Sequence, residues 1–477
     1  MQRSVIRLES GVLSEKGRGF GGVLNFELGE GETVAVVGGN GVGKTTLAET
    51  LLGRHALCRG RLAYGGAAAE GGVRYIAFYE TYNRAEDGEY YYQQRWNSCD
   101  CENAPRVEEL FARVVADEEQ RALCDELCGL LGLESLRSKP VVMLSSGELR
   151  KFQIVRMLLT RARVLVVDNP YIGLDVEARR VMDDLLERLV RQVGVQLVLL
   201  VADEADVPAF VTHVYRIEAG RRLGEKRPRE TLGGERPSVS VPRPVLPAAE
   251  RPPVECEEVV RLEGVTIRYG SRTILRALDW VLRAGEKWAL AGPNGSGKST
   301  LLSLISADNP QAYAQDITLF GRRRGTGESI WAIKRRIGYV SAEMHRSFMR
   351  PIPTVNLVAS GYFDSLGLYE RPTEEQLAVA VAWMEVFGIG GLARRPFLGL
   401  SSGEQRLALL ARAFVKDPDL LILDEPLSGL DAANKARVRG IIDAFCDRPG
   451  KSLIFVSHEE ADFPACITRR LVLRRNG

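Results

Sequence analysis

The stretch VAVVGGNGVGKTTL, residues 34–47, returns as WALAGPNGSGKSTL, residues 288–301. In each copy an apolar run typical of a buried strand leads into a glycine-rich loop, and a helical pattern follows. Both stretches match the pattern G-x-x-x-x-G-K-[ST]. The glycines let the backbone wrap tightly, so that successive N–H groups point at the oxygens of a phosphate chain. The two stretches therefore predict two strand–loop–helix units that bind phosphate.

The polar residues of these loops have separate roles in that chemistry. Lys44 and Lys298 supply a point charge to the β- and γ-phosphates, and Thr45 and Ser299 supply a hydroxyl to Mg²⁺. The candidate nucleotide-binding residues of the two loops are Gly38, Asn40, Gly41, Gly43, Lys44, Thr45 and Thr46, and Gly292, Asn294, Gly295, Gly297, Lys298, Ser299 and Thr300.

The whole pattern of the chain is duplicated. The motif LSSGE at 144–148 returns at 400–404, and ADEADVPA at 202–209 is mirrored by HEEADFPA at 458–465. Because these blocks and the glycine loops recur 254 to 256 residues apart, we expect two homologous domains. The first domain is predicted at residues 1–222 and the second at 257–477, with a Pro-rich, extended linker at 223–256.

Each copy is predicted to be an α/β domain. VLVVD at 164–168 and LLILD at 420–424 are unbroken aliphatic runs, as expected of strands buried on both faces of a mainly parallel sheet. SVIRLE and EVVRLEGVTIRYG alternate apolar and polar residues and suit a small antiparallel β-layer. A helical subdomain completes each domain. Asp168 and Asp424 end the aliphatic strands, where a carboxylate can hold the Mg²⁺ shell with Thr45 and Ser299.

Bulk composition excludes several classes. The chain has 477 residues, 45% hydrophobic and 26% charged, with a formal net charge of +2, which argues against a strongly nucleic-acid-binding surface. It contains no run of 18 apolar residues, and the N-terminus lacks the apolar region of a signal peptide. The eight cysteines show no zinc-ligand spacing, so we expect free thiols and a cytoplasmic location.

With paired glycine–lysine loops, the LSSGE motif resembles the signature of ABC-type ATPases. That resemblance implies ATP and Mg²⁺ as cofactors and two domains that bind head to tail as an intramolecular pseudo-dimer. Each ATP would lie between the glycine loop of one domain and the signature of the other. The signature residues that this assigns are Ser145, Gly147 and Glu148, and Ser401, Gly403 and Glu404. Serine hydroxyls and a helix N-terminus favour an anion, although LSSGE alone is a weak serine N-cap pattern.

The resemblance also assigns catalytic residues, and the two copies differ there. Glu425 lies at the position of the family's general base, and His458 lies at that of the histidine which contacts the γ-phosphate. The first copy has Asn169 and Ala202 instead, which predicts a site that binds ATP but hydrolyses it slowly.

The adenine contact differs between the copies as well. Tyr269 lies where this family stacks an aromatic ring on the base, whereas the first copy has Glu15. The sequence leaves open whether Phe20 substitutes for that ring.

The sequence also departs from the ABC pattern at a position that bears on the expected membrane permease partner. The glutamine that usually follows the GYV strand is absent from both copies, with Glu80 and Glu343 as candidate replacements, which weakens the expectation of ordinary coupling to a permease. The segment YAQDITLFGRRRGTGESIWAIKRRIGYVS narrows the resemblance to the ModF-like (PhrA-type) tandem proteins associated with molybdate transport.

Three functions remain as alternatives. The first is a cytoplasmic ATPase subunit, peripheral at the membrane, that energises an integral membrane permease. The second is a soluble tandem protein that acts on the ribosome, although that branch usually keeps glutamate after both strand aspartates. The third is a DNA-repair ATPase, which the lack of sustained heptads disfavours. RRR at 322–324 is better explained as a solvated loop than as a nucleic-acid patch.

Overall fold

The chain divides into two compact units, the first formed mainly by residues up to 237 and the second mainly by residues from 238 onward. The computed structural model describes residues 4–14, 20, 22–66, 68–69, 72–77, 105–144, 146–171, 174, 176–218, 221–232, 242–249, 252, 255–270, 272–293, 295–341, 344, 348, 351–364 and 370–474.

The first unit is built on a parallel sheet. Its parallel strands follow the order β8, β3, β7, β6, β5, and two short strands pair antiparallel with β8. These strands are β3 (Val34–Val37), β5 (Val73–Ala77), β6 (Val164–Asp168), β7 (Gln196–Val201), β8 (His213–Glu218), β9 (Arg222–Leu223) and β10 (Arg227–Pro228). All residues of β3 and β6 are buried, as the unbroken aliphatic runs predict.

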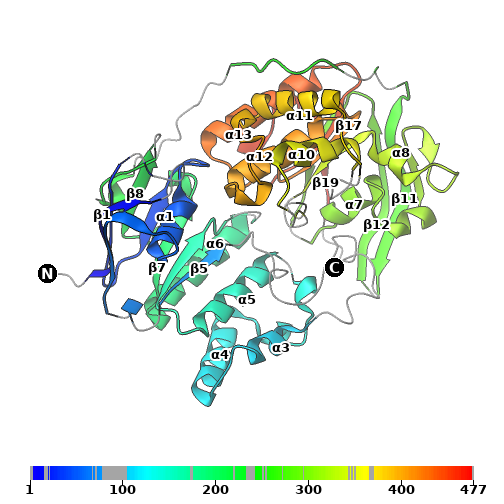
Figure 1. Ribbon diagram of the computed structural model, residues 1–477. Coiled ribbons are helices and arrows are strands. Elements are labelled where there is room, and N and C mark those ends of the chain that lie inside the picture. Colours follow the sequence, from blue (N-terminus) through cyan, green and yellow to red (C-terminus); the bar gives the residue numbers. More distant parts are fainter. Residues whose placement is uncertain are drawn as a thin grey trace. The chain divides into compact units, whose positions relative to one another are not determined.

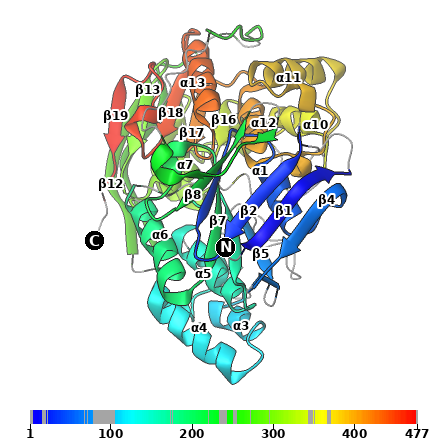
Figure 2. The ribbon, with the colours of Figure 1, turned by 90° about the vertical axis from the view of Figure 1, so that its left-hand side faces the viewer.

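A small antiparallel sheet and a group of helices complete the first unit. Figure 2 shows the sheet in blue, in the order β2 (Leu24–Gly29), β1 (Ser4–Leu13), β4 (Leu57–Tyr64). In Figure 1 the cyan helices of this unit form a group of their own, away from β1. The helices of the unit are α1 (Lys44–Leu51), α3 (Val107–Ala112), α4 (Glu118–Leu131), α5 (Ser146–Leu158) and α6 (Val176–Arg188).

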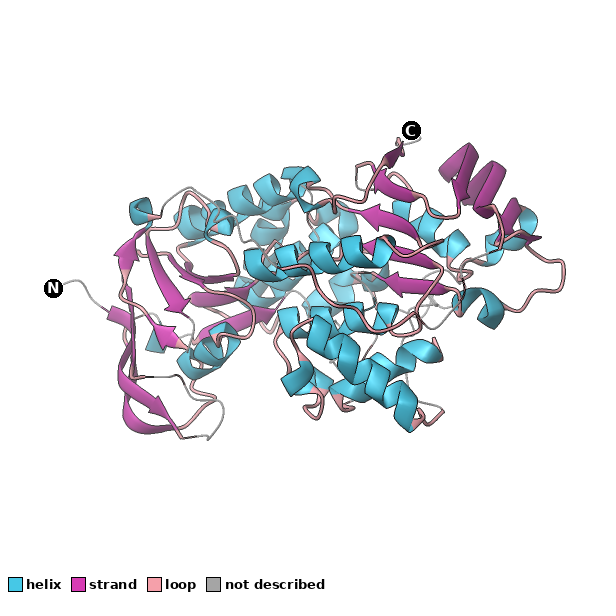
Figure 3. Cartoon of the chain, turned by 90° about the horizontal axis from the view of Figure 1, so that it is seen from above, coloured by secondary structure: helices cyan, strands magenta, loops and turns pink. Residues whose placement is uncertain are grey.

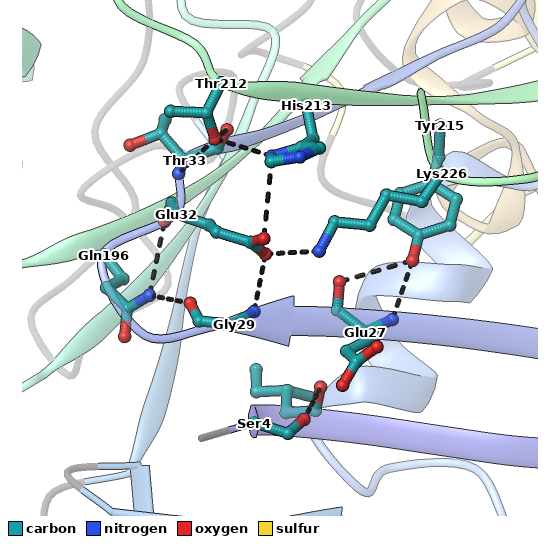
Figure 4. Close-up of polar contacts among 11 residues, drawn as sticks. Ser4, Glu27, Gly29, Glu32, Thr33, Gln196, Thr212, His213, Tyr215 and Lys226 are labelled. Carbon is teal, nitrogen blue, oxygen red and sulfur yellow. Dashed lines mark hydrogen bonds and ion pairs between the residues drawn. The ribbon is translucent and has the colours of Figure 1, made fainter. Parts of the chain in front are cut away.

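A buried carboxylate joins the two sheets of the first unit (Figure 4). Glu32, in the turn between β2 and β3, accepts a hydrogen bond from the Gly29 amide at 2.6 Å and forms an ion pair with Lys226. His213 of β8 lies 3.7 Å from the same carboxylate. Burial alone would raise the pKa of Glu32, but Lys226, the Gly29 amide and His213 together lower it. The ionised carboxylate therefore fixes the end of β2 to the strands that lead toward the linker.

The second unit repeats this plan. Its parallel strands follow the order β19, β13, β18, β17, β16. They are β13 (Lys287–Ala291), β16 (Ile337–Val340), β17 (Leu420–Asp424), β18 (Ser452–Val456) and β19 (Arg469–Val472). An antiparallel sheet has the order β12 (Arg272–Arg283), β11 (Glu258–Tyr269), β14 (Asp316–Leu319), β15 (Arg322–Arg323). The helices are α7 (Lys298–Ile305), α8 (Ile330–Lys334), α10 (Thr354–Ala359), α11 (Glu374–Val386), α12 (Ser402–Phe414) and α13 (Ala432–Cys446).

The two parallel sheets have the same strand order when they are matched by position in their own repeat. Figure 3 shows that each unit combines sheets with flanking helices. The expected α/β fold, with a parallel core sheet, a small antiparallel layer and a helical part in each copy, is therefore confirmed.

Part of the Pro-rich segment packs on the second unit. Residues 242–249 form neither helix nor strand. Arg243 pairs with Asp447 just after α13, and Arg448 donates to the carbonyl of Pro247. This stretch is therefore held along the end of α13 by polar contacts.

Two further observations concern what the described residues contain. No helix among them is both long and apolar enough to cross a membrane. The cysteines in the described ranges are free thiols, namely Cys58, Cys124, Cys128, Cys256, Cys446 and Cys466. Cys99 and Cys101 lie outside these ranges.

Candidate nucleotide-binding sites

The glycine loop of the first unit connects β3 to α1. Gly43, the residue before α1, has φ of 112°, a conformation that a side chain would strain. Lys44 is buried, and its Nζ donates to the carbonyls of Gly38 at 2.5 Å and Gly39 at 2.9 Å. Burial lowers the pKa of Lys44, while the nearby Asp168 opposes this shift. The ammonium group is thus held directly over the loop that is predicted to bind phosphate.

The loop of the second unit has the same geometry between β13 and α7. Lys298 Nζ donates to the carbonyls of Gly292 at 2.6 Å and Pro293 at 3.1 Å. A Cβ atom on Gly292 would lie 2.5 Å from the carbonyl oxygen of Leu473, so this close approach requires glycine.

The remaining predicted loop residues lie where the motif places them. Asn40 and Gly41 are in the first loop and Gly295 and Gly297 in the second, while Thr45, Thr46, Ser299 and Thr300 are in the first turns of α1 and α7. Asn294 lies outside the described residues.

Asp168 ends β6 with its carboxylate enclosed by the first unit. Its Oδ2 accepts from the hydroxyl of Tyr75 at 2.7 Å and from that of Thr45 at 3.2 Å. Its Oδ1 accepts from Nδ2 of Asn169 at 2.8 Å. The residue is 1% exposed. Burial raises its pKa, and the bonds from Tyr75 and Thr45 and the charge of Lys44 oppose that shift.

Asp424 ends β17 at the matching position but in different surroundings. No side chain in the described ranges donates to its carboxylate, and it is partly exposed. Burial raises its pKa, opposed by Arg406 and Lys298. Carboxylate and hydroxyl oxygens are the ligands that Mg²⁺ prefers, so Asp424 and Ser299 fit a metal shell chemically.

Glu425 follows Asp424 in a left-handed backbone conformation with φ of 51°, and Asn169 has φ of 49°. Both amides donate to the neighbouring strand, Glu425 to Val456 at 3.0 Å and Asn169 to Leu200 at 2.9 Å. The two side chains therefore start from the same backbone position.

The Glu425 side chain has the properties of a base. Burial first, and the charge of Asp424 second, raise its pKa to about 8. Its Oε1 lies 3.6 Å from Nε2 of His458, which is longer than a hydrogen bond, and it accepts no hydrogen bond within the described part of the chain. Because β17 and β18 are adjacent and parallel, the residues at their carboxyl ends meet.

A buried arginine that the sequence analysis missed supports this catalytic loop. Arg406, on α12, is 5% exposed, and burial lowers its pKa to about 10. Its guanidinium donates to four backbone carbonyls, those of Ser341, Asp424, Glu425 and Pro426. The signal was present, because Arg150 takes the same place after the first LSSGE and donates to the Pro170 carbonyl at 3.0 Å.

The signature residues form a helix start. Ser401 is the N-cap of α12, and its backbone amide and hydroxyl both donate to Oε2 of Glu404 at 2.8 Å. Gly403 is buried in the first turn. In the first unit Gly147 and Glu148 begin α5, where Glu148 accepts from Lys139 at 2.9 Å. Ser145 lies outside the described residues.

The structure describes both candidate adenine-stacking rings, Tyr269 and Phe20. Tyr269 ends β11, and its hydroxyl accepts from Nδ2 of Asn309 at 3.0 Å. The ring of Phe20 lies 3.1 Å from where a Cβ on Gly43 would be, and Leu275 and Ile274 lie 2.9 and 3.0 Å from the corresponding position on Gly297 in the second unit. Phe20 therefore occupies the place of these two apolar side chains rather than that of Tyr269. Glu15, Glu80 and Glu343 lie outside the described residues.

Comparison with known proteins identifies the family. The family model for the ABC transporter matches residues 22–172 and 275–428. The ABC transporter ATP-binding protein ModF of Escherichia coli K12 is 36% identical over 461 residues, which cover 93% of this chain and 91% of ModF. An uncharacterized ABC transporter ATP-binding protein of Schizosaccharomyces pombe is 27% identical, with 94% and 93% covered.

Solved structures share the tandem fold. A model of ribosome-bound archaeal Pelota and ABCE1 matches with a TM-score of 0.57 and 21% identity, covering 93% of this chain and 72% of that one. The archaeal ribosome recycling factor aABCE1, in complex with the stalk protein aP1, matches with a TM-score of 0.52 and 20% identity, covering 97% and 87%. Such identities show the fold alone. The family model, matched twice, and the similarity to ModF show that this chain belongs to the ABC transporter ATP-binding proteins, as a tandem ATPase.

Proposed function

We propose that this ATPase binds two ATP molecules and hydrolyses one of them, at the site that contains Glu425. The observation that carries the proposal is the pair of Glu425 and His458 in the second unit, at the backbone position where the first unit has Asn169 and Ala202. In its ionised form, a buried carboxylate with a raised pKa is a stronger base and can accept the proton of an attacking water, whereas an amide cannot.

Each residue has a defined role in this proposal. Lys44 and Lys298 neutralise the phosphates, and the loop amides bind the phosphate oxygens. Thr45 with Asp168, and Ser299 with Asp424, would hold Mg²⁺, which when bound neutralises charge on the β- and γ-phosphates. Glu425 removes the water proton, and His458 contacts the γ-phosphate.

The signature residues complete the sites from the other domain. In the head-to-tail pseudo-dimer that the resemblance implies, Ser401 to Glu404 would face the first glycine loop, and Ser145 to Glu148 would face the second. The ATP beside Asn169 holds the domains together, while the ATP beside Glu425 is split. The motif spacing and the resemblance to ABC ATPases support this arrangement.

A matched pair of substitutions tests the division between the sites. Glu425→Gln removes the base and should lower ATP turnover by a factor of about 10² to 10⁴. Asn169→Gln introduces the same side chain at the equivalent position and should change turnover little. Equal losses in a steady-state phosphate-release assay would contradict a single hydrolytic site.

We further propose that the chain acts at the inner face of the cytoplasmic membrane on a separate permease. The resemblance to the ModF-like proteins motivates molybdate, or another oxyanion or metal, as the transported solute. Affinity purification of Glu425→Gln with ATP from detergent-solubilised membranes should recover an integral membrane protein. Recovery of ribosomes in its place would replace transport with the ribosomal alternative.

A further inference from the structure

The two strand aspartates differ in what surrounds them, although their backbone positions match. Within the first unit, three side chains donate to the Asp168 carboxylate: Tyr75 at 2.7 Å, Asn169 at 2.8 Å and Thr45 at 3.2 Å. In the second unit no described side chain donates to Asp424. A carboxylate has about four acceptor positions, so three hydrogen bonds occupy most of the capacity of Asp168.

The strand register explains how Tyr75 reaches Asp168. β5 pairs with β6 in parallel, with Tyr75 opposite Val166 and Ala77 opposite Asp168. Side chains two residues apart lie on one face of a sheet, so the Tyr75 ring lies diagonally beside the carboxylate. Tyr339 has the same register in the second unit, opposite Ile422 of β17. The tyrosine is therefore present twice, but it donates to the aspartate only in the first unit.

Asn169 adds the second donor. Its side-chain amide donates to Oδ1 of Asp168, and the residue is 8% exposed. Glu425, at the same place in the second unit, is an acceptor when ionised and instead repels Asp424. Compared with glutamate, asparagine at position 169 therefore lacks a base and also supplies a hydrogen-bond donor to the Asp168 carboxylate.

These contacts bear on metal binding. A metal shell that engaged Asp168 would have to displace these donors, of which Asn169 is buried and Tyr75 and Thr45 are half-buried, and a donor left without its acceptor costs free energy. Asp424 is more exposed and has no such donors to displace. We propose that Tyr75 and Asn169 are positioning residues that hold Asp168 in protein hydrogen bonds, so that the first unit retains ATP with a weaker dependence on divalent cations than the second.

This inference rests on the proposed function, in which both glycine loops bind ATP. The first loop can do so without the metal because Lys44 and the backbone amides supply the positive field for the phosphates. The hydrogen bonds from Tyr75, Asn169 and Thr45 also disperse the negative charge of Asp168, which would otherwise repel the γ-phosphate.

Single-site variants of the full chain separate the two dependences. Lys298→Ala leaves the first loop intact, and Lys44→Ala leaves the second. ATP affinity is measured by calorimetry in EDTA and in excess Mg²⁺, and Mn²⁺ electron paramagnetic resonance counts the metal bound per nucleotide. We expect Mg²⁺ to improve affinity at the second site about tenfold more than at the first, the order of one charge-assisted hydrogen bond.

The tyrosines supply a matched pair. Tyr75→Phe in the Lys298→Ala chain keeps the ring and removes the donor, so the gain in affinity from Mg²⁺ should rise about tenfold. Tyr339→Phe in the Lys44→Ala chain should leave that gain unchanged. Asn169→Leu is the second test of the same contact and should act in the same direction as Tyr75→Phe.

Two results would overturn the inference, and they are distinguishable from failure of the proposed function. Equal Mg²⁺ gains in the two single-site chains would refute it while leaving two ATP sites standing. An unchanged gain in both Tyr75→Phe and Asn169→Leu would refute the assignment of positioning residues. A Lys298→Ala chain that binds no ATP under any condition would refute the two-site function itself, and the inference with it.

Discussion

Arg406 gives a test of how α12 supports the catalytic loop. Its guanidinium is buried and donates to the carbonyls of Ser341, Asp424, Glu425 and Pro426. Arg406→Met keeps an unbranched, mainly apolar stem, which is shorter than that of arginine, and removes every donor. Each buried carbonyl that loses its partner costs about 1–3 kcal/mol, and the relief of a buried charge offsets part of the total. We expect a net loss of about 3 kcal/mol in the free energy of unfolding.

Turnover should fall with this substitution as well. Arg406 donates to the carbonyls of Asp424 and Glu425, which flank the Cα of Glu425, so its loss releases the backbone that orients the Glu425 side chain. A misplacement of about 1 Å can cost about 100-fold in rate. We therefore expect kcat to fall by at least about tenfold in protein that remains folded. Arg406→Lys keeps the charge on a compact head that cannot span four carbonyls, and it should lose turnover more than stability.

Arg412 on the same helix is the control. It is 4% exposed and donates to the hydroxyl of Ser360 at 3.0 Å, away from the catalytic loop. Arg412→Met should lower stability and leave kcat near its original value. Urea unfolding and phosphate release are measured on both variants. If Arg406→Met and Arg412→Met lose equal stability and both keep full turnover, Arg406 supports only the fold.

Three further predictions concern the first unit. Asn169→Glu alone should leave the phosphate-release rate nearly unchanged, because position 202 still lacks an imidazole. In a Glu425→Gln chain, Asn169→Glu combined with Ala202→His should restore measurable turnover. Identical phosphate-release rates for the Asn169→Glu single variant and the double variant in that chain would contradict this. Gly43→Ala places a side chain at φ of 112° and 3.1 Å from the Phe20 ring, so it should abolish binding of a fluorescent ATP analogue by a Lys298→Ala chain, and retained binding would refute the loop geometry. Glu32→Gln should lower the free energy of unfolding in urea by about 2 kcal/mol at pH 7. Because the pKa of Glu32 is lowered in the folded state, the difference in unfolding free energy between the variant and the original chain should shrink as pH falls below about 4.5. A difference that stays constant with pH would show that the charge is irrelevant.

The sequence predicted the features that are local in the chain. VAVVGGNGVGKTTL and its repeat each specify a strand, a tight loop and the start of a helix within one short stretch, residues 34–47 and 288–301. The structure confirms the α/β fold in both units. The aliphatic runs that end at Asp168 and Asp424 are buried strands because nothing polar interrupts them.

The contacts that separate the two sites could not be predicted in this way. Tyr75 lies 93 residues before Asp168, and only the pairing of β5 with β6 brings its hydroxyl to the carboxylate. The sequence has a tyrosine at the matching place in both copies, so residue identity alone does not reveal that one of them donates and the other does not. The fourfold contact of Arg406 likewise depends on how α12 packs against the end of β17.

Asn169 therefore has two separable effects, and the choice of substitution distinguishes them. Gln at this position keeps an amide donor and still lacks a base, so Asn169→Gln tests neither effect strongly and should resemble the original chain. Glu at this position supplies a base and removes the donor, so Asn169→Glu should raise the Mg²⁺ dependence of ATP binding even where it adds no turnover. If Asn169→Glu instead changed turnover without changing the metal dependence, the hydrogen bond from Asn169 to Asp168 would have no part in how the first unit holds its nucleotide.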